Sequence, residues 1–379
     1  MVRIGITGQA GFIGTHLFNT LSLFREKYLL VPCSDDYFDD EEKLNEFVAS
    51  CDAIVHLAAM NRHNDPAVIY GTNLRLVKQL IKACETTCTT PHILFSSSTQ
   101  EDKENPYGRS KKEGRKLFET WADTQGGQFT GLIIPNVYGP FGHPYYNSVV
   151  ATFCHLLTHN EQPKIDVDGD LKLIYVSELV SQIKECIDQV AGNHQDQVVI
   201  NEVLIQHTVE IKVSSLLKIL NDYKARYFEK GEIPELNSTF RINLFNTFLC
   251  YIDHASFFPF HLKINADNRG SFVETVKLNS GGQVSFSTTV PGITRGNHFH
   301  TRKAERFAVI KGKARIELRR IGTDKVVSFE LDGTRPSFVD MPVWYTHNIT
   351  NVGTEELYTI FWINEFYNSE DPDTYFEVV

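Results

Sequence analysis

The chain of 379 residues is too long for one ordinary domain and predicts at least two. Because 42% of its residues are apolar and 22% are charged, it can build packed cores, which excludes a disordered or fibrous protein. Its formal net charge of −10 repels phosphate backbones, so we expect no nucleic acid among its partners.

The same composition predicts a cytoplasmic protein. Glycines break the N-terminal run MVRIGITGQAGFIG too early for the apolar region of a signal peptide. Residues 124–160 carry no Asp, Glu, Lys or Arg, but prolines interrupt them, so we expect no membrane span. The seven cysteines are an odd number without the spacing of a disulfide framework, as in a reducing compartment.

The first half of the chain alternates apolar strands with amphipathic helices. In chain order we expect strand 2–7, helix 12–23, strand 28–32, strand 53–57, a helix that includes 74–83, strand 92–95, helix 107–122 and strand 129–134. This alternation predicts an α/β fold of Rossmann type, a doubly wound parallel sheet with helices on both faces.

From about residue 257 the pattern changes to short strands separated by Gly, Pro and Asp turns. The expected strands are 282–288, 307–310, 314–318, 325–331 and 357–363. Such a series predicts an all-β barrel or double sheet. Residues 208–248 in between are expected to be helical and polar. We therefore place the domains at 1–250 and 251–379.

A glycine-rich turn joins the first strand to the first helix. Gly8 permits a tight turn, Gly11 allows a pyrophosphate to approach the backbone, and Gly14 allows the helix to pack closely on the strand. The free N–H groups at the helix N-terminus attract phosphate. The predicted dinucleotide-binding residues are Gly8, Gln9, Ala10, Gly11, Phe12, Ile13 and Gly14.

A second motif supplies a proton donor. Asn105 can cap a helix in which Tyr107 and Lys111 are separated by four residues and lie on one face. We expect the Lys111 ammonium to lower the pKa of the Tyr107 phenol, which would let it exchange a proton with a substrate oxygen. Ser98, at the end of the strand before this helix, can hydrogen-bond the same oxygen.

These motifs resemble the extended short-chain dehydrogenase/reductases that act on nucleotide sugars. The matching pieces are TGQAGFIG, DAIVHLAA at 52–59, Asn73, SSS at 96–98, YGRSK at 107–111 and PNVYGP at 135–140. The resemblance implies a catalytic triad of Ser98, Tyr107 and Lys111, with Lys111 also holding the nicotinamide ribose. Tyr107 follows Ser98 unusually closely for the family, so Thr99 remains an alternative hydroxyl.

Further cofactor and substrate contacts are expected around this triad. Leu57 ends the strand 53–57, and Ala58 and Arg62 follow it; Arg62 could bind the extra phosphate of NADP. Asp35 and Asp36 would instead favour the ribose hydroxyls of NAD. We predict NADPH, with NADH as the alternative. The expected sugar-nucleotide contacts are Asn136, Tyr146 and Asn147.

Three histidines and a glutamate in the second half predict a metal site. His298, His300 and Glu305 occur in the pattern G-x5-H-x-H-x4-E, and His347 follows in a later strand. Imidazoles and a carboxylate suit zinc, or another divalent ion such as iron, manganese or nickel. The pattern resembles the cupin superfamily, which implies a jelly-roll barrel. It departs from that family at Trp344, where Gly is usual, and at Pro336, where a second Gly is expected.

A nucleotide-sugar reductase joined to a cupin resembles the bifunctional UDP-hexulose epimerase/reductases of capsule synthesis. The resemblance implies that the barrel inverts a carbon beside the ketone of a UDP-2-acetamido-2,6-dideoxy-4-hexulose. The first domain then reduces the ketone, toward UDP-N-acetyl-L-fucosamine. It also implies a homodimer. Lys303, Asp340 and Tyr345 are candidate acids or bases for the inversion.

Two other functions fit the same motifs. The first is a nucleotide-sugar epimerase/dehydratase that retains NAD and uses the cupin only to bind sugar. The second is a sugar-nucleotide sensor without catalysis.

Overall fold

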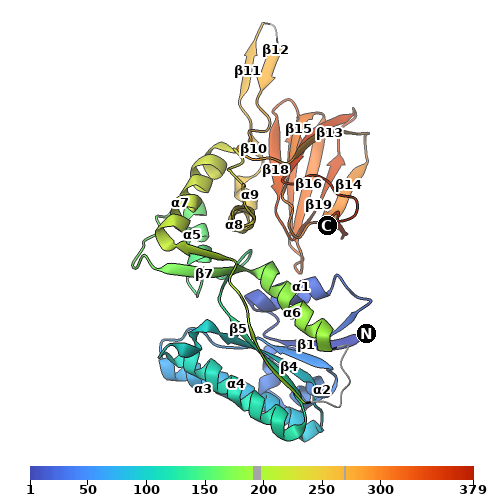
Figure 1. The fold of residues 1–379 in the computed structure, drawn as a ribbon. Helices are drawn as coiled ribbons and strands as arrows, with labels where there is room; N and C mark the ends of the chain where they lie inside the picture. The colour runs from blue at the N-terminus through green and yellow to red at the C-terminus, as the bar shows by residue number, and fades with distance from the viewer. Residues whose placement is uncertain (191–197, 269) are drawn as a thin grey trace. The chain divides into compact units, whose positions relative to one another are not determined.

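The computed structural model describes residues 1–190, 198–268 and 270–379 of the chain (Figure 1). The described residues form two compact units. The first unit comprises residues 1–138, 142–148 and 170–211, and the second comprises 139–141, 149–169 and 212–379.

A six-stranded parallel sheet is the centre of the first unit. Its strands lie in the order β2-β1-β3-β4-β5-β8, all parallel to their neighbours. They are β2 (Tyr28–Val31), β1 (Val2–Thr7), β3 (Ala53–His56), β4 (His92–Ser98), β5 (Gln128–Ile134) and β8 (Val199–Leu204). This order confirms the predicted Rossmann-type sheet and places the reversal of strand order at β1 and β3, where such folds bind their ligands.

Helices cover both faces of this sheet and bury one apolar cluster on each. On one face pack α1 (Phe12–Leu21) and α6 (Val176–Val190), and on the other α2 (Glu41–Ala49), α3 (Pro66–Thr87) and α4 (Pro106–Gln125). Figure 1 shows α3 and α4 side by side. The Asp65 and Asn105 side chains start these two helices by accepting hydrogen bonds from Ala67 N (2.9 Å) and Gly108 N (2.8 Å).

Shorter elements complete the first unit. The 3₁₀ helices η1 (Asp35–Asp39) and η2 (Thr99–Asp102) follow β2 and β4 directly or after a short turn. A small sheet has the order β6-β7-β9, with strands β6 (Asn136–Tyr138), β7 (Asp170–Tyr175) and β9 (Val209–Lys212).

The second unit contains the predicted β barrel, built from two antiparallel five-stranded sheets. One has the order β10-β18-β15-β20-β13, with β10 (Phe260–His261), β18 (Ser337–Met341), β15 (Glu305–Lys311), β20 (Leu357–Ile363) and β13 (Gln283–Thr289). The other has the order β17-β16-β19-β14-β21, with β17 (Val326–Asp332), β16 (Lys313–Arg320), β19 (Tyr345–Asn351), β14 (Thr294–Phe299) and β21 (Tyr375–Phe376). A separate hairpin comprises β11 (Ile264–Asp267) and β12 (Gly270–Val273).

Helices belong to the second unit as well. They are α5 (Val149–Thr158), α7 (Val213–Tyr223), the π-helix η3 (Lys224–Phe228), α8 (Thr239–Leu249) and α9 (His254–Phe257). A buried ion pair joins them to the barrel. The Arg306 guanidinium binds the Asp340 carboxylate at 2.7 and 2.8 Å and donates to Gly231 O (2.6 Å), and the Tyr227 hydroxyl of η3 donates to Asp340 (2.5 Å). This compact unit therefore begins well before residue 250, and the division at 250 remains a prediction.

Among the described residues, no helix combines the length and apolar character that crossing a bilayer requires.

Candidate active sites

The glycine turn lies between β1 and α1 and against the end of β3. Gly8 has φ +70°, and a Cβ there would lie 2.8 Å from Ala58 N, so only glycine fits this turn without strain. A Cβ on Gly14 would lie 2.2 Å from Gly8 O, so only glycine allows α1 to lie this close to the turn. α1 begins at Phe12, directly after Gly11, so its first N–H groups face the turn. This geometry fits a dinucleotide pyrophosphate.

The loop after β3 is held in place by a buried asparagine. Asn73 of α3 accepts from Met60 N (2.7 Å) and donates to Met60 O (3.0 Å) and to Ser110 Oγ of α4 (2.9 Å). It thereby connects the loop that carries Leu57 and Ala58 to the helix that carries Tyr107 and Lys111. Asn73 is among the residues that resemble the short-chain dehydrogenase/reductases, and in the structure it links the loop after β3 to α4.

Tyr107 and Lys111 lie together on α4, as predicted. The Lys111 side chain is only 2% exposed, and its ammonium lies 5.7 Å from the Tyr107 ring centroid and 4.8 Å from that of Phe95. Its hydrogen bond goes to Ser96 Oγ (3.4 Å), a residue that sequence reasoning missed. Ser96 and Ser98 are two positions apart on β4 and share a face, which was the available signal.

The expected lowering of the Tyr107 pKa was wrong for this structure. Burial raises the pKa of Tyr107, and the nearby Tyr146 raises it further. Burial also lowers the pKa of Lys111 to about 7, with Glu101 opposing this shift. With this pKa the lysine is only partly charged at neutral pH, so it stabilises a phenolate little. Tyr107 therefore keeps its proton.

Ser98 ends β4 and is nearly buried, and its hydroxyl accepts from Gln100 N (3.2 Å), so it caps η2. Thr99 is the first residue of η2 and is exposed. Both hydroxyls remain candidates for contact with the substrate oxygen.

The predicted sugar-binding residues lie on exposed segments. Asn136 and Asn147 are exposed, and the Tyr146 hydroxyl accepts from Asn61 N (3.2 Å). The guanidinium of Arg62 donates to the Tyr145 and Tyr146 carbonyls. Tyr146 thus lies beside the loop that follows β3 and near Tyr107. Arg62, predicted to bind a phosphate, here fastens this loop to the segment 142–148.

The four predicted metal ligands come together in the barrel. One donor atom from each of His298, His300, Glu305 and His347 can be chosen so that all four lie within 4.8 Å of one another. Glu305 Oε2 lies 3.3 Å from His300 Nε2 and 3.1 Å from His347 Nε2. These three atoms are buried and make no conventional hydrogen bond among the described residues. Buried donors that converge in this way fit a divalent cation.

Hydrogen bonds on the far side of the rings orient two of the histidines. His300 Nδ1 bonds to the Asp373 carbonyl, and His347 Nδ1 lies 3.2 Å from the Tyr345 carbonyl. A ring that donates from Nδ1 presents a free Nε2 lone pair to a metal. Burial and the two neighbouring imidazoles lower the pKa of His298 to about 4, so this ring is neutral and ready to coordinate.

Burial alone would raise the pKa of Glu305. The neighbouring His300 and His347 imidazoles outweigh that effect and hold the pKa of Glu305 well below its usual range. The glutamate is therefore ionised, as a ligand of a divalent cation must be.

Two backbone features explain how the strands deliver these side chains. Asn297 has φ +57° and lies in a bulge of β14, after which His298 pairs with His347 of β19. Trp344 has φ +63°, in the region that favours glycine, which fits the glycine that the cupin resemblance leads one to expect at this position. Its ring is 3% exposed and stacks on Phe299, with centroids 5.7 Å apart.

The three candidate acids or bases lie in other surroundings. Asp340 is bound to Arg306, which follows Glu305 on β15 and so points to the opposite face, away from the metal ligands. The Lys303 ammonium donates to the Pro372 carbonyl. The Tyr345 ring contacts His254, with centroids 5.1 Å apart. Asp340 is therefore structural, and the other two have structural partners.

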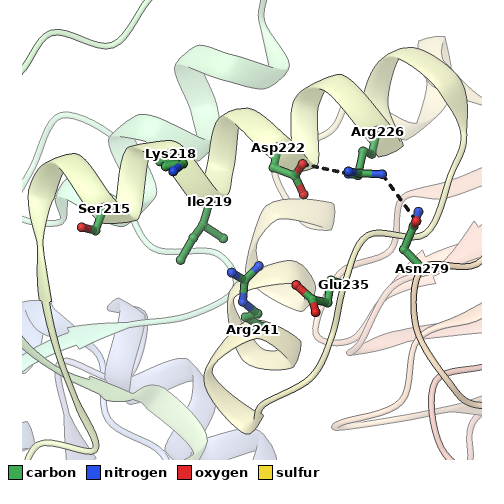
Figure 2. A pocket seen from close by; sticks show the side chains of 8 residues that line it. All are labelled: Ser215, Lys218, Ile219, Asp222, Arg226, Glu235, Arg241 and Asn279. Atoms are coloured by element: carbon green, nitrogen blue, oxygen red, sulfur yellow. Dashed lines mark hydrogen bonds and ion pairs between the residues drawn. The ribbon is translucent and has the colours of Figure 1, made fainter.

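A cavity of about 600 Å³ lies elsewhere in the second unit (Figure 2). Arg226 on its wall binds Asp222 (2.8 Å) and Asn279 (3.4 Å), as the dashed lines show. The lining consists of Ser215, Lys218, Ile219, Asp222, Arg226, Glu235, Arg241 and Asn279. It includes none of the residues described above, and we assign it no part in the chemistry.

Comparison with known proteins decides the family. Residues 4–201 match the NAD dependent epimerase/dehydratase family, and residues 265–375 match the polysaccharide biosynthesis C-terminal domain. The chain is 31% identical over 376 residues to a UDP-2-acetamido-2,6-beta-L-arabino-hexul-4-ose reductase of Pseudomonas aeruginosa, covering 99% of this chain and 98% of that protein. The chain belongs to the NAD dependent epimerase/dehydratase family.

Within this family, the likeness to one solved protein extends over both units. The crystal structure of the capsular polysaccharide assembling protein CapF from Staphylococcus aureus is 32% identical, with a TM-score of 0.61 and coverage of 100% of both chains. The NADPH complex of RMD from Pseudomonas aeruginosa covers 59% of this chain and 83% of its own at 21% identity and a TM-score of 0.50, and it shows the fold alone. The predicted architecture, a Rossmann-type domain followed by a cupin-like barrel, is thus confirmed.

Proposed function

We propose that the chain is a bifunctional enzyme of sugar-nucleotide synthesis for capsular polysaccharide. Its barrel epimerises a UDP-2-acetamido-2,6-dideoxy-4-hexulose beside the ketone, and its first unit reduces that ketone with NADPH, toward UDP-N-acetyl-L-fucosamine. The observation that carries this proposal is the presence of both residue sets in one chain, which aligns end to end with CapF and with the Pseudomonas reductase.

In the reduction, Tyr107 is the proton donor. Bound NADPH would supply the hydride, with its pyrophosphate on the turn from Gly8 to Gly14. The raised pKa of Tyr107 keeps the phenol protonated, so it can deliver the proton to the ketone oxygen. Lys111, with a pKa of about 7, can return a proton to Tyr107 at neutral pH. The Ser98 hydroxyl, or that of Thr99, steadies the same oxygen.

In the epimerisation, His298, His300, Glu305 and His347 hold zinc or another divalent cation. Such a cation would polarise the ketone and so acidify the neighbouring C–H bond. The Phe307 ring lies 5.8 Å from that of His347 and 5.9 Å from that of Phe361, which gives the cluster an apolar wall. An apolar wall keeps water away and strengthens the electrostatic interactions of the site.

Residues at two places in the first unit favour different cofactors, NADPH at one and NADH at the other. Arg62 lies in the loop after β3, where it can exchange its carbonyl partners for the extra phosphate of NADPH. Asp35 and Asp36, at the start of η1 after β2, favour NADH. We propose NADPH as the working cofactor.

We also propose that the enzyme is a cytoplasmic homodimer. Seven free cysteines support a reducing compartment. The hairpin β11–β12 and the strand β13, which ends its sheet, carry the exposed aromatic residues Phe272 (65% exposed) and Phe286 (73% exposed). A lone hairpin is marginally stable in water and an unpaired edge attracts strands, so a second copy is the partner that would cover both.

The test follows the product by NMR after incubating the UDP-4-keto sugar with NADPH or NADH in heavy water. We expect stoichiometric oxidation of NADPH, label from a deuterated cofactor at the reduced carbon, and solvent deuterium at the neighbouring carbon. Tyr107→Phe should abolish reduction but keep the deuterium exchange. His347→Ala should abolish the deuterium exchange but keep the reduction of a substrate that is already epimerised. Tyr70→Phe, in a partly exposed tyrosine of α3 whose hydroxyl bonds to Glu113, is the control and should change neither.

Inversion without net oxidation of cofactor would favour the epimerase that retains NAD. Binding of the sugar nucleotide without any turnover would favour the sensor.

A further inference from the structure

The C-terminal segment 371–376, which we call the clasp, binds residues 298–303, the end of β14 and the loop after it, which carry His298 and His300 and which we call the ligand loop. Tyr375 and Phe376 form β21, which pairs with Phe299 and His298 of β14. The Lys303 ammonium donates to the Pro372 carbonyl, and Arg302 binds Asp371 at 2.8 Å. The clasp is therefore joined to both ends of the ligand loop.

Asp373 is the centre of these contacts. Its carboxylate accepts four hydrogen bonds: from Thr301 N (3.1 Å), Thr301 Oγ1 (2.7 Å), Arg302 N (3.0 Å) and Lys303 N (3.1 Å). The side chain is buried, and its backbone has φ +41°, an uncommon conformation that Asp tolerates better than most residues. Uncommon backbone conformations persist where the surroundings fix them, and here one carboxylate satisfies three successive backbone N–H groups.

The backbone of the same residue contacts a metal ligand. The Asp373 carbonyl bonds to His300 Nδ1, whereas His300 Nε2 faces Glu305 Oε2 at 3.3 Å. β14 ends at Phe299, and the carbonyl of the next residue, His300, accepts a hydrogen bond from Trp344 N (2.8 Å), which holds its backbone but does not orient its ring. Because a carbonyl only accepts, this bond requires the proton of a neutral His300 to be on Nδ1, which leaves Nε2 free to coordinate.

We propose that Asp373 is a positioning residue for the metal. Its carbonyl sets the tautomer and direction of the His300 ring, and its carboxylate holds that carbonyl in place. This inference rests on the proposed metal site. It assigns a role to a residue 73 positions away from His300 in the sequence.

The test compares Asp373→Ala and Asp373→Asn in the full chain. Zinc affinity is measured by competition with a chromophoric chelator, and the His300 tautomer by NMR of the metal-free protein labelled with ¹⁵N-histidine. We expect Asp373→Ala to weaken zinc binding about 10–100-fold and to remove the signature of the Nδ1–H tautomer. Asp373→Asn keeps the volume and the backbone preference but puts an NH₂ group against N–H donors, so we expect a smaller loss.

Asp371→Ala is the matched control. Asp371 is two residues away, its side chain is 66% exposed, and it binds Arg302 at the surface. It should leave zinc affinity unchanged. Binding of NADPH by each variant reports that its first unit is folded, and cooperative thermal unfolding like that of the parent reports the same for the second unit.

Three outcomes separate the proposals. Zinc affinity within twofold of the parent in Asp373→Ala overturns the role of Asp373 and leaves the proposed function standing. Equal loss in Asp371→Ala and Asp373→Ala also overturns it, because any disturbance of the clasp would then have the same effect. Absence of binding of any divalent metal by the parent chain overturns the metal step of the proposed function, and this inference with it.

Discussion

Lys111 shows how the catalytic role proposed for a residue opposes the stability of the fold. The side chain is buried among Phe95, Tyr107 and Ser96, and it has no carboxylate partner in hydrogen-bond distance among the described residues. Burial of an unpaired ammonium lowers its pKa to about 7. The fold therefore keeps a group that costs free energy of folding whenever it is charged.

This imbalance predicts a stability that depends on pH. The lysine titrates near 7 when folded and near 10.5 when unfolded, so between these values the unfolded state binds more protons and stability rises with pH. Lys111→Met should thus be more stable than the parent at pH 6–7, on the order of a few kcal/mol, and the difference should shrink toward pH 10. Urea unfolding at several pH values measures it.

Lys112→Met is the control for this effect. Lys112 is the next residue, its side chain is 46% exposed, and it lies 3.8 Å from Asp102. It should change stability little at any pH. A constant offset between Lys111→Met and the parent over the whole range would refute the explanation.

Trp344 presents two opposing effects at one position. A bulky residue at φ +63° costs about 1–3 kcal/mol, whereas truncating a buried indole costs about 3–5 kcal/mol. Because the packing is worth more, Trp344→Gly should lower the free energy of unfolding by about 1–3 kcal/mol, although it restores the residue usual in related barrels. Thermal and urea unfolding would check this, and a more stable glycine variant would mean that strain dominates.

At the scale of elements, the hairpin β11–β12 is the least supported piece of the second unit. In its two strands, 264–267 and 270–273, every residue except Val273 is exposed, with the apolar side chains of Ile264 and Phe272 among them. Such a hairpin gains most of its stability from a partner. The strand β13 lies at the edge of its sheet, so the backbone groups on its outer side pair with no strand of that sheet. Such an edge can pair with a strand of another chain.

We therefore expect Phe272→Ser and Phe286→Ser each to weaken self-association at least tenfold. Sedimentation equilibrium at micromolar concentrations measures the dimer directly. Val167→Ser, at an apolar residue that is 78% exposed and outside both strands, is the control and should leave association unchanged. Dimers of full strength in both phenylalanine variants would place the interface elsewhere, and a parent chain that stays monomeric would remove it.

Over the whole molecule, local patterns were predicted best. Strand 2–7 and strand 357–363 have the predicted bounds, because continuous apolar runs between turn residues leave little ambiguity. The convergence of His298, His300, Glu305 and His347 was predicted because a motif places these residues close in sequence or in register. Asp373 was missed because no motif connects it to His300, and its contact depends on how the chain end packs.

An amphipathic pattern predicts a helix but not which part of the chain that helix packs against. Residues 208–248 were expected to be helical; α7 and α8 confirm this for 213–223 and 239–248, but residues 209–212 form the strand β9. The sequence of the two helices shows an apolar face but not what it contacts. Asn246 of α8 donates to the Arg302 carbonyl of the barrel at 2.9 Å, which no periodicity could indicate.

The ion pair between Arg306 and Asp340 limits how evolution or a designer can exchange parts among these enzymes. Its third member, Tyr227, and the carbonyl of Gly231 come from the chain before the barrel begins. A barrel transplanted from residue 251 onward would lack both partners. Asp340 would lose the Tyr227 hydroxyl, and Arg306 would lose the Gly231 carbonyl. A breakpoint for recombination between relatives therefore belongs upstream of α7, so that the barrel travels together with its helices.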